Sequence, residues 1–217
     1  PGVTIKPVVK TLAERTGWKP EIKNVKQPQI KPVKRGVGFA CGFKNVGFSF
    51  GTPEYCNAKI ELYGKAKIEK AILYHAGAEV GQGSHTVFKQ MTAEALDVSP
   101  EKIEMVLADT GTSEYAGSVS ASRMTFMAGN AIQGAANNAL MNWRDENRPA
   151  VGEFVYYAPK TSTFDPETSA CKPNFAYGYA AEIVELEVDT ETGEIQLLKV
   201  HCANPVVKAI NPPQVQG

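Results

Sequence analysis

The sequence lacks several features that mark common classes of protein. No Cys-x-x-Cys or other close pair, which zinc and iron–sulfur sites usually need, occurs among Cys41, Cys56, Cys171 and Cys202. No apolar run approaches the roughly eighteen residues of a membrane-spanning helix, and no signal-peptide pattern is present. We therefore expect free thiols, a cytoplasmic protein without membrane association, and no metal bound directly by its side chains.

The chain has no net charge, but its charges are unevenly distributed. Residues 1–35 hold nine basic and two acidic residues, a net charge of +7, so residues 36–217 carry −7. A basic segment can bind nucleic acid. Here, however, the lysines lie among prolines, with no aromatic residue between them except Trp18. We favour a solvated connector that contacts an acidic neighbour, and expect no nucleic-acid partner.

The most informative stretch is residues 77–86 (GAEVGQGSHT), where small residues and one amide lie between a predicted strand and a predicted helix. Unpaired N–H groups at a helix N-terminus favour phosphate-like ligands. The common phosphate motifs fit poorly, because no lysine follows Gly83 and Thr86 stands where a third glycine is needed. On this loop alone, a tight glycine turn without a ligand remains the alternative.

A second stretch of small and hydroxylic residues, 117–123 (GSVSASR), precedes a predicted helix at 124–143 that is rich in Ala and Gly. Small side chains let a backbone approach a bulky ligand closely, and they suit the helix to close packing. Arg123 ends the stretch. It either pairs with a phosphate or is an ordinary surface arginine at the start of a helix.

Hydrophobic periodicity predicts an α+β fold, a mixed β-sheet with helices packed on it. Helices are expected at 8–16, from the glycine loop to about 96, and at 124–143; strands are expected at 36–50, 57–62, 67–75, 103–108, 183–188 and 195–200. The last two strands alternate and form a hairpin. Residues 144–174 are predicted as mostly loop, with one short strand at 154–157. A basic, Pro/Lys-rich helix and connector (1–35) thus precedes one domain (36–217).

In order, these motifs resemble the molybdopterin-binding (large) subunit of the xanthine dehydrogenase and aldehyde oxidase family, and specifically part of its second molybdenum-binding domain. Residues 79–86 resemble its Glu-hydrophobic-Gly-Gln-Gly-x-His-Thr loop. Residues 118–123 and 129–131 resemble its Ser/Ala-rich loop with Gly-Asn-Ala, and later motifs match 175–182, 189–193 and 209–217. The resemblance places the family's catalytic glutamate beyond residue 217, so we expect a truncated domain with no catalytic residue.

The resemblance implies part of a molybdenum hydroxylase, an oxidoreductase that hydroxylates an aldehyde or N-heterocycle with oxygen from water. It implies molybdopterin in its cytosine dinucleotide form, with 2Fe–2S and FAD groups on other domains or subunits. The expected partners are the remaining molybdopterin-binding domains, the iron–sulfur and FAD subunits and a small-molecule substrate, in an oligomer. The alternative is a non-catalytic module that binds a pterin dinucleotide or a partner subunit. The isolated chain is expected to be inactive.

The resemblance also assigns cofactor binding to Gly81, Gln82, Gly83, Ser120, Ala121 and Ser122. Gln82 would hydrogen-bond the pterin or a molybdenum oxo group, since an amide donates without adding charge. The two glycines would permit the approach, and residues 120–122 would offer N–H and hydroxyl groups. Because Gln82 lies outside any apolar stripe, we expect it to matter little for folding.

Other residues have competing interpretations. Phe50 falls where the family often places an aromatic against a flat substrate, but a buried core phenylalanine is the favoured interpretation. His85 is expected to pack or hydrogen-bond beside the motif rather than to act in catalysis. His75 and His201 are expected to be structural. Glu79 is expected to brace the loop by accepting backbone N–H bonds.

Overall fold

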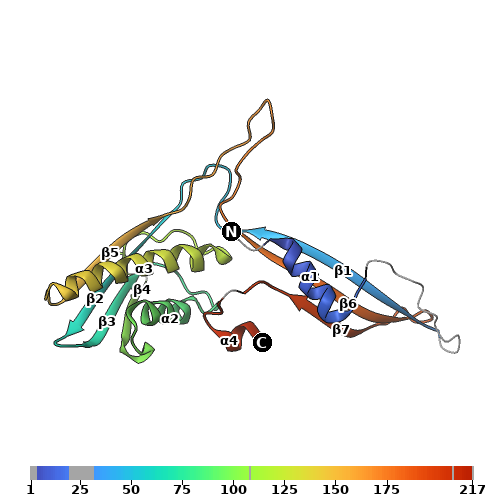
Figure 1. The fold of residues 1–217 in the computed structure, drawn as a ribbon, viewed down its shortest axis with the longest axis horizontal. Coiled ribbons are helices and arrows are strands. Elements are labelled where there is room, and N and C mark those ends of the chain that lie inside the picture. Colours follow the sequence, from blue (N-terminus) through green and yellow to red (C-terminus); the bar gives the residue numbers. More distant parts are fainter. Residues whose placement is uncertain (1–3, 20–31, 108, 207, 217) are drawn as a thin grey trace. The chain divides into compact units, whose positions relative to one another are not determined.

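A computed structural model of the chain describes residues 4–19, 32–107, 109–206 and 208–216 (Figure 1). The chain divides into two units, each formed by segments that are distant in sequence. Unit 1 comprises residues 1–44 and 177–207, and unit 2 comprises residues 45–176 and 208–217. Of the part that the structure describes, no helix is long and apolar enough to cross a membrane.

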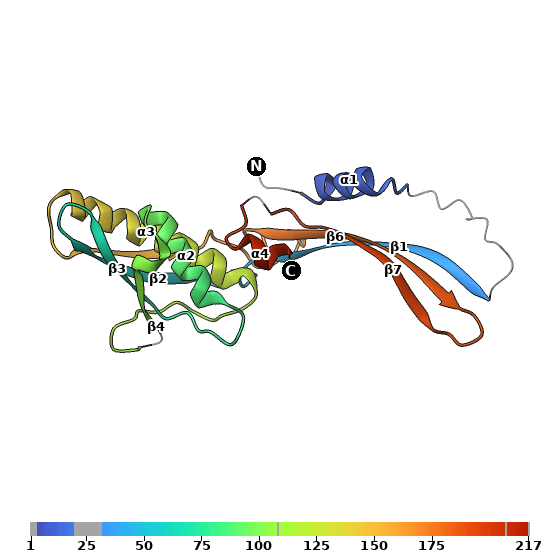
Figure 2. The same cartoon turned by 90° about the horizontal axis from the view of Figure 1, so that it is seen from below.

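Unit 1 is a three-stranded sheet with one helix against it. Its strands, in spatial order, are β1 (Val33–Asn45), β6 (Tyr177–Asp189) and β7 (Ile195–Ala203). Strands β6 and β7 pair antiparallel, as their alternating sequences predict. Helix α1 (Ile5–Thr16) lies along the sheet (Figure 2) and buries Val8 and Leu12, one helical turn apart, against β6. It ends at Gly17, whose φ of 68° is left-handed and costs glycine little.

The two units do not follow the division predicted at residue 35. Helix α1 was assigned to a separate basic segment, but its buried Val8 and Leu12 pack with Ala181 and Ile183 from the C-terminal part of the chain. An amphipathic helix needs a partner for its apolar face, and here strand β6 supplies that partner. Residues 20–31 of the predicted connector lie outside the described residues.

Unit 2 contains a four-stranded mixed sheet with helices on one face (Figures 1 and 2). The strand order is β4 (Ile103–Leu107), β3 (Ile68–His75), β2 (Tyr55–Gly64) and β5 (Ala150–Tyr157). Strand β3 is parallel to β4, whereas β2 is antiparallel to both β3 and β5. The helices are α2 (Ser84–Leu96), α3 (Ser122–Arg144), the short 3-10 helix η1 (Pro100–Lys102) and α4 (Pro212–Gln216). The predicted α+β class is confirmed, with the strands divided between two sheets.

The core of unit 2 lies between helix α3 and strands β2 and β5. Alternate residues of β2 are buried, namely Cys56, Ala58, Ile60 and Leu62. Helix α3 faces them with fully buried small side chains, namely Ala128, Ala131, Ala135, Ala136 and Ala139. Small residues let a helix approach a sheet closely, so the Ala-rich composition of 124–143 correctly indicated its packing.

Several strand boundaries differ from the predictions, among them those of β5 and β1. Strand β5 covers Ala150–Tyr157, where only 154–157 was expected, and all of it pairs with β2. Strand β1 ends at Asn45 rather than near residue 50. The chain turns there because Gly47 and Phe50 adopt φ values of 80° and 56°, which no strand accommodates.

Candidate functional site

The two loops singled out in the sequence precede two helices that lie side by side. Helices α2 and α3 run in the same direction (Figure 1). Met91 of α2 and Gly129 of α3 each occupy the eighth position of their helix. They face each other, because a Cβ on Gly129 would lie 3.3 Å from Met91 Cε. The N-termini of both helices, and the loops that lead into them, therefore lie on the same side of unit 2.

The first loop is organised around the carboxylate of Glu79. Its Oε1 accepts the N–H groups of Gly81 and Gly83 at 2.8 and 2.9 Å. Its Oε2 accepts the N–H of His85 at 3.1 Å and the hydroxyl of Ser84 at 3.2 Å. The predicted bracing role of Glu79 is confirmed. The chain's own carboxylate thus occupies N–H groups of Gly81, Gly83 and His85 that an external anion would otherwise bind.

These bonds predict a distinctive titration of Glu79. They lower its pKa from 4.5 to about 2, with the His85 N–H as the largest cause. A lowered pKa means that the contribution of Glu79 to stability is complete above pH 4.5 and is lost as the pH falls through about 2. An NMR titration of the Gly81 and Gly83 amide shifts should therefore show a midpoint near 2. Glu79→Gln should abolish the transition, and a midpoint near 4.5 would contradict the bracing.

Gln82 is exposed, but its amide is engaged within the loop. The N–H of Val80 donates to Gln82 Oε1 at 2.7 Å. Gln82 Nε2 donates to the carbonyl of Ala78 and to the hydroxyl of Ser84, both at 3.1 Å. Oε1 keeps one lone pair free. Gln82 thus helps to shape its own loop, which its place outside an apolar stripe did not indicate.

Two histidines lie behind this loop. His85 Nε2 lies 3.0 Å from the carbonyl oxygen of Gly77, which confirms the predicted hydrogen-bonding role. His75 is buried between the Gly77 N–H, 2.9 Å from its Nδ1, and Cys56 Sγ, 3.4 Å from its Nε2. Burial lowers the pKa of His75 to about 4. His75 is therefore a neutral core residue, as predicted.

The second loop remains open at its helix. Ser120, Ala121 and Ser122 are exposed, and no side chain caps the start of α3. Ala121, at the N-cap position, has φ 44° and ψ −134°. Such a conformation costs a non-glycine residue about 1–3 kcal/mol and is found most often at functional sites. The first turn of α3 can therefore offer N–H and hydroxyl donors to a ligand.

Arg123 follows neither of its two sequence-based interpretations. Its side chain is only 2% exposed and forms an ion pair with Glu54, also 2% exposed, with Nε donating to Oε2 at 2.5 Å. Its Nη1 donates to the carbonyls of Ala116 and Ser118 at 3.2 and 2.9 Å. A Cβ at Gly117 would lie 2.5 Å from the guanidinium, so glycine is needed there. Arg123 fastens the second loop to the start of β2 and is not free for a phosphate.

Phe50 does not join the two loops. Phe50 is 46% exposed and its ring stacks on Phe164 with centroids 5.2 Å apart, so the favoured buried-core interpretation is wrong. Its backbone N–H donates to the carbonyl of Pro173. The contacts of Phe50 thus come from the segment after β5 and not from residues 77–85 or 117–123.

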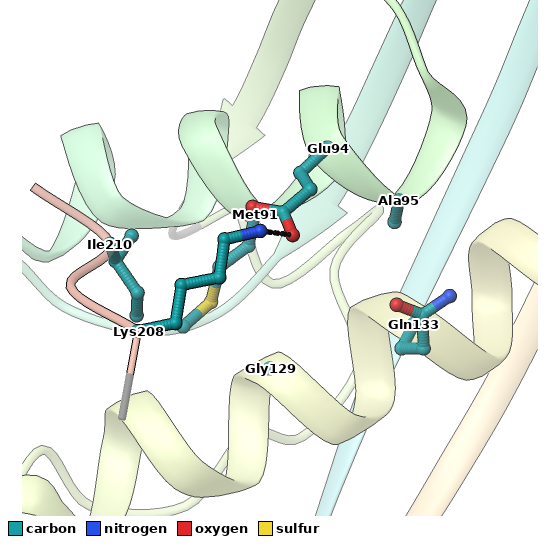
Figure 3. Close-up of a pocket in the computed structure, with 7 residues that line it drawn as sticks. All are labelled: Met91, Glu94, Ala95, Gly129, Gln133, Lys208 and Ile210. Carbon is teal, nitrogen blue, oxygen red and sulfur yellow. Dashed lines mark hydrogen bonds and ion pairs between the residues drawn. The ribbon is translucent and has the colours of Figure 1, made fainter. Parts of the chain in front are cut away.

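A pocket of about 270 Å³ lies between α2, α3 and residues 208–210 (Figure 3). Its lining consists of Met91, Glu94, Ala95, Gly129, Gln133, Lys208 and Ile210, and includes none of the predicted cofactor residues. Lys208 forms an ion pair with Glu94 across its opening. Within the described residues, no three His, Cys, Asp or Glu side chains cluster as metal ligands.

One polar residue near the first loop was missed in the sequence. Gln214 lies in the short helix α4, and its amide nitrogen is 3.8 Å from the position that a Cβ on Gly83 would take. Gln214 belongs to segment 209–217, which resembles a family motif. Hydrophobic periodicity, however, gives no information about a polar residue next to prolines. The fold places Gln214 beside the glycine loop, although the two are separated in sequence by more than half the length of the chain.

Comparisons with known proteins agree with the sequence motifs. Residues 11–151 and 140–217 match the sequence model of the molybdopterin cofactor-binding domain. The chain is 26% identical over 216 residues to a probable xanthine dehydrogenase subunit of Bacillus subtilis (strain 168), covering 85% of this chain and 29% of that protein. It is 25% identical over 210 residues to the xanthine dehydrogenase/oxidase of Mus musculus, covering 87% and 15%.

A solved structure with the same fold is the aldehyde oxidoreductase from Desulfovibrio desulfuricans ATCC 27774. The TM-score is 0.69 and the identity 25%, over 91% of this chain and 22% of that one. The chain therefore spans less than a third of the length of each of these relatives.

Proposed function

This chain belongs to the molybdopterin cofactor-binding domain family, and from that premise we propose that it is part of a molybdenum hydroxylase and holds the pterin cofactor through its two loops. One observation carries the proposal. Residues 81–83 and 120–122 are distant in sequence, yet they precede two parallel, packed helices whose N-termini lie on the same side of unit 2. Because the chain spans less than a third of its relatives, the activity belongs to the intact parent protein.

The residues present fit such a cofactor. The start of α3, with its exposed Ser120 and Ser122 and no side-chain cap, suits the anionic oxygens of a phosphate. Gly81 has φ 104°, and a Cβ there would meet no atom within 4 Å, so its backbone is open to close approach. Glu79 already holds the N–H groups of Gly81, Gly83 and His85. We therefore assign the phosphates to residues 120–122, and a neutral polar edge or oxo group to Gln82, with Gln214 beside it.

When bound, the cofactor supplies the molybdenum chemistry that hydroxylates a carbon next to nitrogen or oxygen with oxygen from water. The residues of this chain bind and orient it. Gln82 can donate an amide N–H without adding charge, once its Nε2 gives up one of its hydrogen bonds within the loop. Glu79 is a poor proton acceptor at neutral pH, because four hydrogen bonds hold its pKa at about 2. We assign the general base to another part of the parent protein.

Further assignments belong to the same proposal. We propose the cytosine dinucleotide form of the cofactor, 2Fe–2S and FAD groups on other domains or subunits, an aldehyde or N-heterocycle as substrate, and a cytoplasmic, oligomeric parent. Two relatives are themselves named as subunits, one of a xanthine dehydrogenase and one of a 6-hydroxypseudooxynicotine dehydrogenase complex, which supports subunit partners. Phe50 stays a proposed substrate contact on the strength of its exposed, stacked ring. The isolated chain should be inactive.

The test is Gln82→Ala in the intact parent protein. Losing a hydrogen bond to a strongly polar group typically costs about 1.5–3 kcal/mol, so turnover or molybdenum content per polypeptide should fall roughly ten- to a hundred-fold. Unfolding of the cofactor-free protein should change by less than about 1 kcal/mol, because water replaces the exposed loop bonds.

The matched control is Gln133→Ala, which removes an exposed amide that donates along α3 to Asn137. It should leave molybdenum content and turnover unchanged. If Gln82→Ala also keeps full molybdenum content and full turnover, the first loop does not hold the cofactor and the proposed function loses its site.

A further inference from the structure

The loop that carries Gln82 is closed at its base by two histidines that hold one glycine. The N–H of Gly77 donates to His75 Nδ1 at 2.9 Å, and the carbonyl oxygen of Gly77 lies 3.0 Å from His85 Nε2. A carbonyl only accepts, so His85 Nε2 carries a proton; a backbone N–H only donates, so His75 Nδ1 carries none. Both backbone polar groups of Gly77 are thus bound by imidazole rings.

Packing around Gly77 leaves no room for a side chain. Gly77 is buried, and a Cβ there would lie 2.8 Å from the ring of Phe88 and 2.9 Å from His75 Cε1. The Phe88 ring contacts both histidines, with centroids 4.6 Å from His75 and 6.1 Å from His85. Such contacts fix the orientation of both imidazole rings. The position therefore requires glycine for reasons of space, and the two rings set where its peptide groups point.

We call the two contacts of His75 and His85 with Gly77 the clamp. The clamp joins the two ends of the loop. Gly77 comes two residues after β3 ends, and His85 is the second residue of α2. The bond between them closes a ring of chain that contains Glu79 and Gln82. We propose that His75 and His85 are positioning residues, which hold the base of the loop so that Gln82 presents its amide to the cofactor. The link to the cofactor rests on the proposed function.

The environment of His75 and Cys56 keeps the clamp in one protonation state at neutral pH. On its far side, His75 Nε2 faces Cys56 Sγ at 3.4 Å. Burial raises the pKa of Cys56 to about 12 and lowers that of His75 to about 4. Both groups are then neutral near pH 7, and a neutral His75 with its proton on Nε2 leaves Nδ1 as the acceptor for the Gly77 N–H.

The test compares His85→Leu with His85→Gln in the intact parent protein, prepared with and without cofactor. Leucine keeps apolar volume but loses the donor, whereas the glutamine amide can still donate to the Gly77 carbonyl. In the cofactor-free protein, His85→Leu should speed amide hydrogen exchange of Gly81 and Gly83 about fivefold or more, the effect of one net hydrogen bond. In the loaded protein it should lower molybdenum content by a similar factor, and His85→Gln should restore both.

The outcomes separate this inference from the proposed function. Unchanged exchange in His85→Leu, or equal defects in His85→Leu and His85→Gln, would overturn the clamp. Faster exchange with full molybdenum content would keep the clamp and overturn cofactor binding by the loop. Lys89→Ala, one turn further along α2, is the control and should match the wild type. His75→Asn, which keeps an acceptor for Gly77, should retain more protection than His75→Leu, and the reverse order would also contradict the clamp.

Discussion

Arg123→Met is expected to destabilise unit 2 by about 3–5 kcal/mol, the usual cost of leaving one charge of a buried ion pair unpaired. Arg123 and Glu54 are each only 2% exposed, so water cannot solvate the carboxylate that remains. Glu54 also accepts the backbone N–H of Phe48 at 2.6 Å, which holds it in place. Chemical denaturation followed by the fluorescence of Trp143, in a Trp18→Phe background, measures the change in unit 2.

The double variant Arg123→Met/Glu54→Gln should recover much of that loss, because no uncompensated charge is then buried. Recovery should be incomplete, since the carbonyls of Ala116 and Ser118 still lose their donor. The control is Lys70→Met, which breaks an exposed pair with Glu104 and should cost less than about 1 kcal/mol. A loss in Arg123→Met no larger than in Lys70→Met would show that the buried pair is not what holds the second loop.

The sequence predicted those parts of unit 2 that depend on neighbours in the chain. A glycine loop followed by a helical pattern placed the start of α2 correctly, because Gly83 has the left-handed conformation, φ 80°, from which the helix begins at Ser84. The Ala-rich pattern located α3 and its close packing. The order of the motifs identified the family without any knowledge of their positions in space.

The sequence failed where a distant residue decides the outcome. Arg123 and Glu54 are 69 residues apart, and neither has a local pattern that marks it as buried. For loop 77–86 the sequence left open whether the loop binds an anion or is a tight glycine turn without a ligand, and it predicted bracing by Glu79. Anion binding and bracing compete for the same N–H groups, and the structure gives them to Glu79. Which one prevails depends on the fold of the loop, not on its composition.

Strand β5 shows a third kind of failure, which arises from packing against a helix. Its positions facing α3 begin with Ala150 and Gly152, both buried, so the start of the strand lacks the large apolar side chains by which a strand is recognised. Gly152 lies opposite Ile60 of β2 in the sheet register. Gly152 made the strand hard to recognise in the sequence because it has no side chain. The same absence of a side chain allows α3 to lie against the strand.

For that reason Gly152→Ala is expected to destabilise unit 2 by about 3 kcal/mol or more, at the upper end of the cost of overpacking. A Cβ on Gly152 would overlap the carbonyl oxygen of Ala135 and the backbone nitrogen of Ala139, and would lie 2.8 Å from Ala139 Cα. These are main-chain atoms of α3, so no change of rotamer can relieve the overlap and the helix itself must move. Chemical denaturation of the variant measures the cost.

Two further variants decide whether close approach of the main chains is the cause. In Gly134→Ala the nearest atoms belong to the ring of Phe154, a side chain that is 38% exposed and can shift, and alanine also favours a helix, so its cost should be smaller. Gly38→Ala, in strand β1, meets nothing within 4 Å and should be neutral or slightly stabilising. If Gly152→Ala unfolds no more easily than these two, α3 does not need a glycine beneath it, and the tight contact between α3 and β5 is not what sets the packing of unit 2.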